Sequence, residues 1–187
     1  MKKICISVTL TVVCFFVANA QIKPVKNMMP ANVKTGMKKE DILGLHIFKA
    51  LKEKDNYQWQ ALYQTGFEFE KLLQLMLAKK SEGLTQQKID EMVRQRGIEA
   101  EAVFNREFKN YLLQADSLGI KWKDAVMEKF DVEKRHSQSA AIRYLDGIIW
   151  FRCKKNHFVL EGIEAVELEN GYKLQAVKGF RQVDDGE

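Results

Sequence analysis

The stretch that decides the fold is GIIWFRCKKNHFVLEGIEAVELENGYKL, which runs from Gly147 to Leu174. Apolar segments fill most of it, and two short polar segments, at residues 154–156 and 169–171, interrupt them. Apolar segments of strand length separated by a few turn residues are typical of β-hairpins. The stretch therefore predicts two consecutive antiparallel hairpins.

The length of the first turn decides which residues of the first hairpin face each other. A three-residue turn with Asn156 in the left-handed conformation pairs Trp150 with Leu160. The same register pairs Cys153 with His157 and places their side chains within reach of each other. We expect this register for the first hairpin.

A three-residue turn is also expected in the second hairpin, with Gly171 in the left-handed conformation. This turn pairs Leu168 with Tyr172. The alternative is a two-residue turn at residues 170–171, which pairs Leu168 with Lys173 and so sets an apolar side chain against a charged one. The three-residue register is the better match.

The predicted register makes both faces of the first hairpin apolar. One face carries Trp150, Phe158 and Leu160, and the other carries Ile149, Phe151 and Val159. Burial of each such side chain is worth roughly 1.5–3 kcal/mol, so neither face is expected to remain in water. Helices can cover one face. The other must line a concavity, meet a partner or be covered by the early helices, which points to binding rather than to chemistry.

Helical periodicity precedes the sheet, over residues 40–119. Residues 55–58 and 65–68 each have a short polar residue followed three positions later by Gln or Glu, which is the pattern of a capping box. We therefore expect helices to begin near Asp55 and Thr65. The second of these carries a wide apolar stripe, and Gly83 is expected to end it.

Thr85 is expected to cap the next helix, and Gly97 to interrupt it. The clearest helical stripe follows, with these apolar residues at helical spacing: Phe104, Phe108, Tyr111, Leu112, Ala115 and Leu118. Gly119 is expected to close this helix, whose stripe indicates packing against a sheet.

Beyond Gly119 the period changes to two. Val126, Phe130 and Val132 alternate with charged residues, which predicts a half-buried strand. The sequence as a whole therefore predicts an α+β fold, with N-terminal helices packed on a curved antiparallel sheet of about four strands.

A helix ending in LGIKW (residues 118–122), a strand, and a meander closing on ENGYKL (residues 169–174) together resemble small exported proteins of Bacteroidetes-type bacteria. Those proteins are similar in build to the cystatin-like and NTF2-like α+β superfold, a curved antiparallel sheet wrapped around a helix. The resemblance covers roughly residues 104–183, and the several helices before Phe104 depart from the simplest three-helix version. It implies a fold that hosts enzymes, ligand carriers and adaptor domains, so it does not choose among them.

The first twenty residues have the features of an export signal. Lys2 and Lys3 precede an apolar run over residues 4–17, and small residues at 18–20 fit a cleavage site before Gln21. The run is too short for an ordinary membrane span, and the residues before Cys14 lack the small-residue box of a lipid anchor. We expect an exported protein, periplasmic or secreted, without a stable membrane anchor.

Cleavage would leave Cys153 as the one cysteine of the mature chain, so no internal disulfide is expected. Residues 21–39 contain both prolines and are expected to form a flexible basic linker before a single domain at residues 40–187. Residues 1–39 contain seven lysines and no acidic residue, whereas the whole chain has a net charge of +5. The predicted domain is therefore slightly acidic and has no basic stripe, which argues against a nucleic-acid partner.

Cys153 and His157 are the first candidates for chemistry, as a thiolate–imidazolium pair across the hairpin. They would sit at a hairpin tip with no evident third residue and no oxyanion loop. We therefore expect a packed cysteine beside a surface histidine.

Glu164 is the second candidate. By strict alternation it shares the face of Trp150, where it would have a raised pKa or need a partner such as Arg152. A β-bulge near Glu164 and Ala165 would instead turn it outward, and a solvent-open end of the sheet would leave it in water. An inward Glu164 could read a ligand or move a proton.

Metal and cofactor sites are not expected. None of His46, His136 and His157 stands at metal-ligand spacing from another, and no phosphate loop, dinucleotide fingerprint or nucleophile elbow is present. Arg143, Tyr144 and Asp146 are expected to form a polar loop that either rims a pocket mouth or is simply solvated.

The sequence thus favours a non-enzymatic exported protein that binds an apolar or amphipathic ligand, or a protein partner, through its sheet face. The expected ligand-binding residues are Trp150, Arg152, Phe158, Leu160 and Glu164. One alternative is an NTF2-like isomerase or cyclase with Glu164 as acid or base. Another is a homodimerising structural module in which the second apolar face meets its copy.

Overall fold

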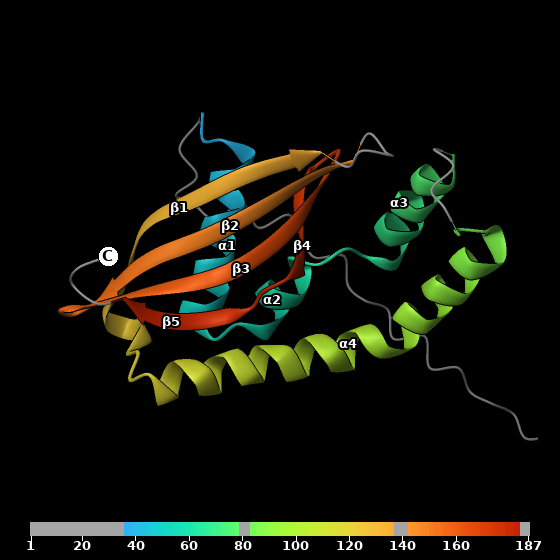
Figure 1. Cartoon of the computed structure of the whole chain (residues 1–187). Coiled ribbons are helices and arrows are strands. Elements are labelled where there is room, and N and C mark those ends of the chain that lie inside the picture. The colour runs from blue at the N-terminus through green and yellow to red at the C-terminus, as the bar shows by residue number, and fades with distance from the viewer. Residues whose placement is uncertain (1–35, 79–82, 137–141, 184–187) are drawn as a thin grey trace, which may run out of the picture. The chain divides into compact units, whose positions relative to one another are not determined.

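The computed structural model describes residues 36–78, 83–136 and 142–183. Its helices pack with a five-stranded antiparallel sheet, which confirms the α+β class (Figure 1). The helices are α1 (Lys39–Glu53), α2 (Asn56–Ala61), α3 (Gly66–Ala78), α4 (Gln86–Ser117) and the short 3₁₀ helix η1 (Trp122–Asp124). The strands are β1 (Ala125–His136), β2 (Arg143–Cys153), β3 (Asn156–Leu168), β4 (Gly171–Ala176) and β5 (Gly179–Val183). The predicted signal peptide and most of the predicted linker lie outside the described residues.

The strands follow the order β1-β2-β3-β4, and β5 adds a fifth strand to the expected four. β3 is long enough to have two neighbours on one edge. Its first half, residues 157–161, pairs with β5, and its second half, residues 164–168, pairs with β4. Between the two halves lies Gly162 with φ +63°, where an added Cβ would stand 2.5 Å from the Cβ of Lys178.

The first hairpin has a two-residue turn at Lys154 and Lys155, so the predicted three-residue turn is wrong. Lys154 has φ 59°, and Cys153 pairs with Asn156. The observed register sets Phe151 opposite Phe158, and their rings stack with centroids 5.6 Å apart. Pairing two large rings on the face that the helices bury outweighs the turn preference on which the prediction rested.

The second hairpin also has a two-residue turn, at residues 169–170, and Leu168 pairs with Gly171. Both registers considered from the sequence are therefore wrong, although Gly171 has the expected positive φ, at +130°. Tyr172 and Leu174 point into the main core in the observed register, while Lys173 points to the other face.

The corrected registers change which residues share a face. Phe158 and Leu160 lie with Ile149 and Phe151 on the face that α1, α2 and α4 cover, and they are almost fully buried. Trp150 lies on the opposite face, so its predicted grouping with Phe158 and Leu160 is wrong.

The main core is rich in aromatic side chains. Phe151 is central to it, because its ring contacts four others: those of Phe48, Trp122, Phe158 and Phe180. The apolar stripe of α4 packs against the same core, as its spacing predicts. On β1, a bulge between Met127 and Lys129 places Met127 on the core face and leaves Val126 exposed, so the predicted inward position of Val126 is wrong.

A second, smaller core lies where α3 packs against the opposite face of the sheet. It contains Leu72, Ile142 and Val166, with Met76, Tyr144 and Leu168 packed around them. α3 therefore covers the sheet beside Tyr144 and Val166, and none of the apolar residues expected on the faces of the first hairpin belongs to this second core.

The helix boundaries follow the capping patterns. Asp55 accepts hydrogen bonds from the backbone N–H groups of Tyr57 and Gln58, and Thr85 accepts one from that of Lys88. The predicted interruption at Gly97 is wrong, because α4 continues through it, although Figure 1 shows the helix axis changing direction along its length. α4 ends before Gly119, which has the φ of +74° typical of a glycine after a helix.

Candidate functional site

The five residues expected to bind a ligand do not form one site. Phe158 and Leu160 are in the main core, whereas Trp150, Arg152 and Glu164 belong to the opposite face of the sheet. Around Trp150 that face is charged: the Nζ of Lys129 lies 4.6 Å from the centre of the indole ring. The structure therefore does not support a pocket made of these five side chains together.

Glu164 is exposed and pairs across the strands with Asp146. A bulge does turn Glu164 away from the face of Leu160, but it lies between Leu160 and Ile163 of β3 and not at Glu164 and Ala165, where the register shift adds its extra residue to β4. Glu164 lines neither of the two grooves described below. The enzyme alternative needs an inward Glu164 beside a cavity, and this side chain is not placed that way.

Cys153 and His157 do not face each other. Cys153 is buried in the main core, where its Sγ lies 3.3 Å from the backbone N of Lys121 and accepts its hydrogen bond. His157 is on the opposite face, with its Nδ1 3.2 Å from a carboxylate oxygen of Glu128. The predicted dyad geometry is wrong because the two-residue turn shifts the register by one residue, while the expectation of a packed cysteine is confirmed.

Arg143, Tyr144 and Asp146 belong to β2 and not to a loop, so that prediction is wrong. Asp146 pairs with Arg135, and Tyr144 packs in the second core. His46 is in α1 and His136 ends β1. Within the part of the chain that the structure describes, no cluster of three or more His, Cys, Asp or Glu side chains could hold a metal ion, and no helix is both long and apolar enough to cross a membrane.

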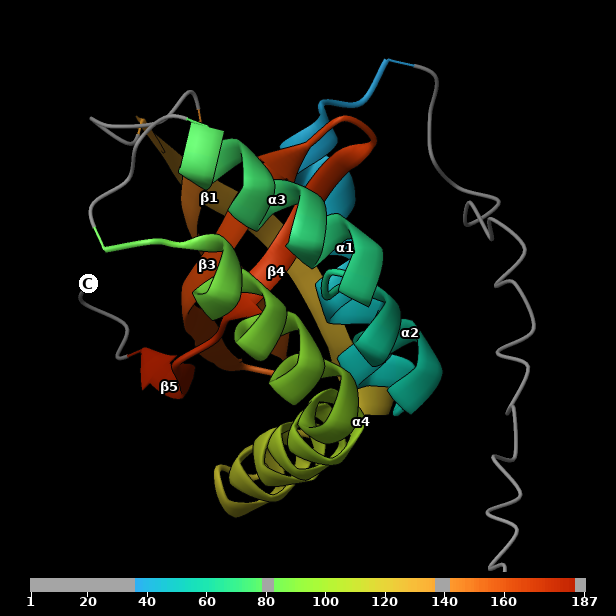
Figure 2. The ribbon, with the colours of Figure 1, turned by 90° about the vertical axis from the view of Figure 1, so that its right-hand side faces the viewer.

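A groove between α3 and α4 is the strongest candidate for a functional site. We call it the α3–α4 groove, and its volume is about 280 Å³. Figure 2 shows the two helices next to each other on the side that faces the viewer. The lining residues are Phe69 from α3, and Met92, Gln95, Arg96, Ala100, Val103 and Phe104 from α4. Most of this surface is apolar, and Met92 is 41% exposed.

Helical periodicity explains why these residues line one groove. Positions 92, 96, 100 and 104 of α4 follow one another at four-residue intervals, and residues four apart lie on the same face of a helix. The ring of Phe104 stacks on that of Tyr63 with centroids 4.0 Å apart, which fixes one wall.

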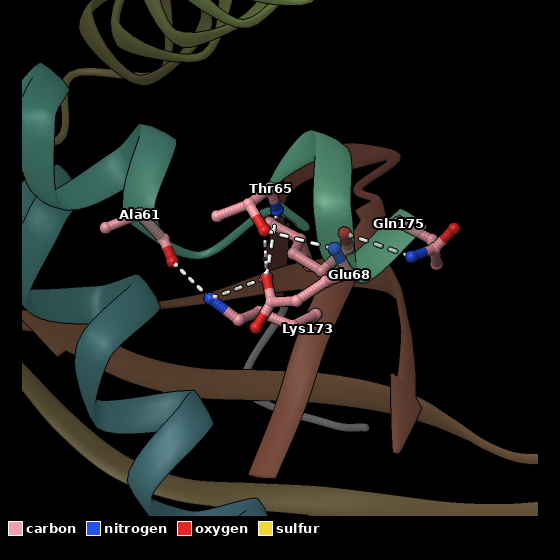
Figure 3. Close-up of polar contacts among 6 residues, drawn as sticks. Ala61, Thr65, Glu68, Lys173 and Gln175 are labelled. Carbon is pink, nitrogen blue, oxygen red and sulfur yellow. Dashed lines mark hydrogen bonds and ion pairs between the residues drawn. The ribbon is translucent and has the colours of Figure 1, made fainter. Parts of the chain in front are cut away.

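The other wall is fixed by contacts at the start of α3, shown in Figure 3. The backbone N–H of Thr65 donates to the carboxylate of Glu68, and the N–H of Glu68 donates to the Thr65 hydroxyl, which forms the expected capping box. Lys173 of β4 donates to the carbonyl of Ala61 and lies 3.6 Å from the Glu68 carboxylate. These contacts hold the first turn of α3 against β4, and Phe69 is the next residue.

Arg96 is the unusual member of the groove. Its Cζ lies 4.4 Å from the centre of the Phe69 ring and 5.6 Å from that of Phe104, so the guanidinium lies over both rings. Among the described side chains, no carboxylate forms an ion pair with it, and its buried Nε–H has no protein acceptor. Burial lowers the pKa of Arg96, although a guanidinium remains charged at neutral pH.

Sequence reasoning missed Arg96 because Gly97 was expected to break the helix. With α4 continuous, the spacing of Arg96, Ala100 and Phe104 would have placed a cation within an apolar stripe. That pattern is the signal that could have found the site.

A second groove, of about 370 Å³, is lined by Glu107, Asn110, Tyr111, Gln114 and Lys178. Several of its polar groups already have structural partners. The Tyr111 hydroxyl donates to the carbonyl of Val177 at 2.7 Å, and burial raises the pKa of this phenol to about 12. Gln114 bonds both the N–H and the carbonyl of Phe180 in β5. These contacts dock α4 on β5, so we assign this groove a structural role.

His46 gives a prediction about pH. Burial lowers the pKa of its imidazole below the ordinary value near 6.5, and its Nε2 is buried without a protein partner. Because the unfolded chain then binds a proton more readily than the folded one, stability is present above the unfolded-state pKa and is lost as the pH falls below it. Between pH 7 and pH 5, the free energy of unfolding of the His46→Gln variant should fall by less than that of the wild type. Urea denaturation at each pH measures both. Parallel losses in the two proteins would contradict this assignment.

Comparisons of the chain with protein-family models, with curated proteins and with solved structures gave no match.

Proposed function

We propose that this protein is an exported envelope protein that binds an amphipathic ligand in the α3–α4 groove and does not act as an enzyme. Export rests on the N-terminal sequence, with its two lysines, apolar run and small-residue cleavage site. The resemblance to cystatin-like and NTF2-like proteins stays a prediction and is compatible with a ligand carrier.

The observation that carries the proposal is an open, largely apolar groove that contains one half-buried cation without a carboxylate among its described neighbours. Ligand sites typically combine apolar walls with a few polar groups that fix the orientation of the ligand. A groove of about 280 Å³ is slightly smaller than the usual range of roughly 300–1,000 Å³. It therefore suits one narrow apolar chain better than a bulky or two-chained molecule.

Blocking the groove tests the proposal. Ala100 lines it, so Ala100→Trp should fill the space and weaken binding of N-phenyl-1-naphthylamine, a neutral apolar probe that fluoresces on binding, by at least about tenfold. Ala102 is on the same helix and exposed but does not line the groove, so Ala102→Trp is the matched control and should bind like the wild type. Absence of saturable binding to the wild type, or equal affinities for the two variants, would count against the proposal.

The dimerisation alternative retains one supporting observation. Val126 and Ile148, on the face opposite the main core, are 51% and 36% exposed. Sedimentation of the mature protein at high concentration tests it: a strictly monomeric chain would remove this alternative.

A further inference from the structure

We infer that the α3–α4 groove selects a ligand with a single acidic head, and that its natural occupant is a long-chain monocarboxylate held by the guanidinium of Arg96. This inference rests on the proposed function, since it names the class of ligand that the same groove takes.

The charge of the groove supports an anionic head. Arg96 is the one charged side chain among the described residues that line it. Partial removal of the Arg96 charge from water has a free-energy cost that an opposite charge would offset. Here that compensation comes partly from the rings of Phe69 and Phe104, at 4.4 and 5.6 Å, and no described carboxylate adds to it. A ligand anion would complete the neutralisation.

The position of the guanidinium beside two aromatic rings is compatible with a carboxylate partner. A guanidinium that stacks on aromatic rings uses its faces for the rings and keeps the N–H donors at its edge for an acceptor in the same plane. A carboxylate matches this planar fork with two parallel hydrogen bonds. With one cation at the site, a head with one negative charge is neutralised, whereas a phosphate dianion would keep excess charge.

The remaining lining residues suit the tail of such a molecule. Met92, Ala100 and Val103 offer aliphatic surface next to Arg96, and Phe69 and Phe104 add aromatic surface. Burial of each methylene group contributes a further increment of affinity, so a saturated chain of about ten carbons gains from this groove.

Competition for the groove separates this inference from the proposed function. Decanoate, 1-decanol and decyltrimethylammonium have the same chain and differ in the charge of the head. Each would displace N-phenyl-1-naphthylamine from the wild-type protein at pH 7.5, below its critical micelle concentration. We expect decanoate to compete roughly tenfold to a hundredfold better than the other two, the gain of a charge-assisted hydrogen bond.

Arg96→Gln should remove the preference for decanoate, measured as the ratio of decanoate to 1-decanol competition within the same variant, so that a change in the groove wall affects both compounds alike. Arg94→Gln is the matched control, because Arg94 is on the same helix, is 66% exposed and already pairs with Glu91. Arg96→Lys should keep a reduced preference, since it retains the charge and loses the planar fork. Saturable binding of the probe and of 1-decanol by each variant shows that its groove still accepts an apolar molecule.

The outcomes are distinct. Equal competition by the three decyl compounds in the wild type would overturn the inference and leave the proposed function standing, whatever the variants do. A decanoate preference that survives in Arg96→Gln would also overturn it. If neither the probe nor any decyl compound binds, the proposed function fails and the inference fails with it.

Discussion

Phe151→Ala is expected to lower the free energy of unfolding by about 3–5 kcal/mol, the usual cost of truncating a large aromatic residue in a core. The Phe151 side chain is 1% exposed and contacts four aromatic rings, so few neighbours can move into the space that it leaves. Chemical denaturation followed by circular dichroism measures the loss.

Ile148→Ala is the control on the same strand. Ile148 lies on the opposite face and is 36% exposed, so its truncation should cost about 1 kcal/mol. Equal costs for the two variants would mean that the faces of β2 are not assigned correctly.

The register itself can be tested with a double-mutant cycle. Phe151 and Phe158 face each other and stack, so their alanine substitutions should be coupled by about 0.5–1.5 kcal/mol. The three-residue turn expected from the sequence would couple Phe151 to Val159 instead.

Gly147→Ala is expected to destabilise the protein by about 2 kcal/mol, although alanine is normally the better residue within a strand. An added Cβ would stand 2.4 and 2.6 Å from two ring atoms of Phe130. The ring already lies so close to the backbone of Gly44 in α1 that a Cβ there would be only 2.6 Å from it. It therefore has no room to move towards α1. Phe130 thus occupies a slot between two glycines, one on the sheet and one on α1.

Gly97→Ala is the matched control for this substitution. Nothing lies within 4 Å of an added Cβ there, and the position is inside α4, so stability should rise by about 0.5–1 kcal/mol. Combining Gly147→Ala with Phe130→Leu should cost less than the sum of the two single changes, since the smaller side chain relieves the contact. Additive losses would show that the ring is not the cause.

Local chemistry made the helix starts predictable. Asp55, Thr65 and Thr85 act as caps through bonds that span two or three residues, so the sequence contains all the information needed. The stripe of α4 was predictable for a related reason, since its period needs only one helix and one buried face.

The hairpin registers were not predictable because their deciding contacts are remote. Lys173 is a poor match for its β3 partner Val166, but its side chain contacts the carbonyl of Ala61 and the carboxylate of Glu68, more than a hundred residues earlier in the chain. The turn residues alone could not reveal that α2 and α3 lie beside β4.

The candidate site was only partly accessible for the same reason. Phe69 and Phe104 were expected as core residues. Arg96 was not recognised as part of a site, because Gly97 was expected to interrupt the helix. A glycine inside a helix costs about 1 kcal/mol relative to alanine, which tertiary packing can offset.

Binding in the α3–α4 groove is tested most directly by following the arginine Nε–H and tryptophan indole N–H signals by ¹H–¹⁵N NMR while decanoate is added to the mature protein. If the ligand binds in the α3–α4 groove, the Arg96 signal moves saturably and the signals of Arg94 and Trp150 stay in place, because Arg96 alone among these three lines that groove. Movement of the Trp150 indole signal with a stationary Arg96 signal would contradict binding in the α3–α4 groove and place the binding site on the face of the sheet.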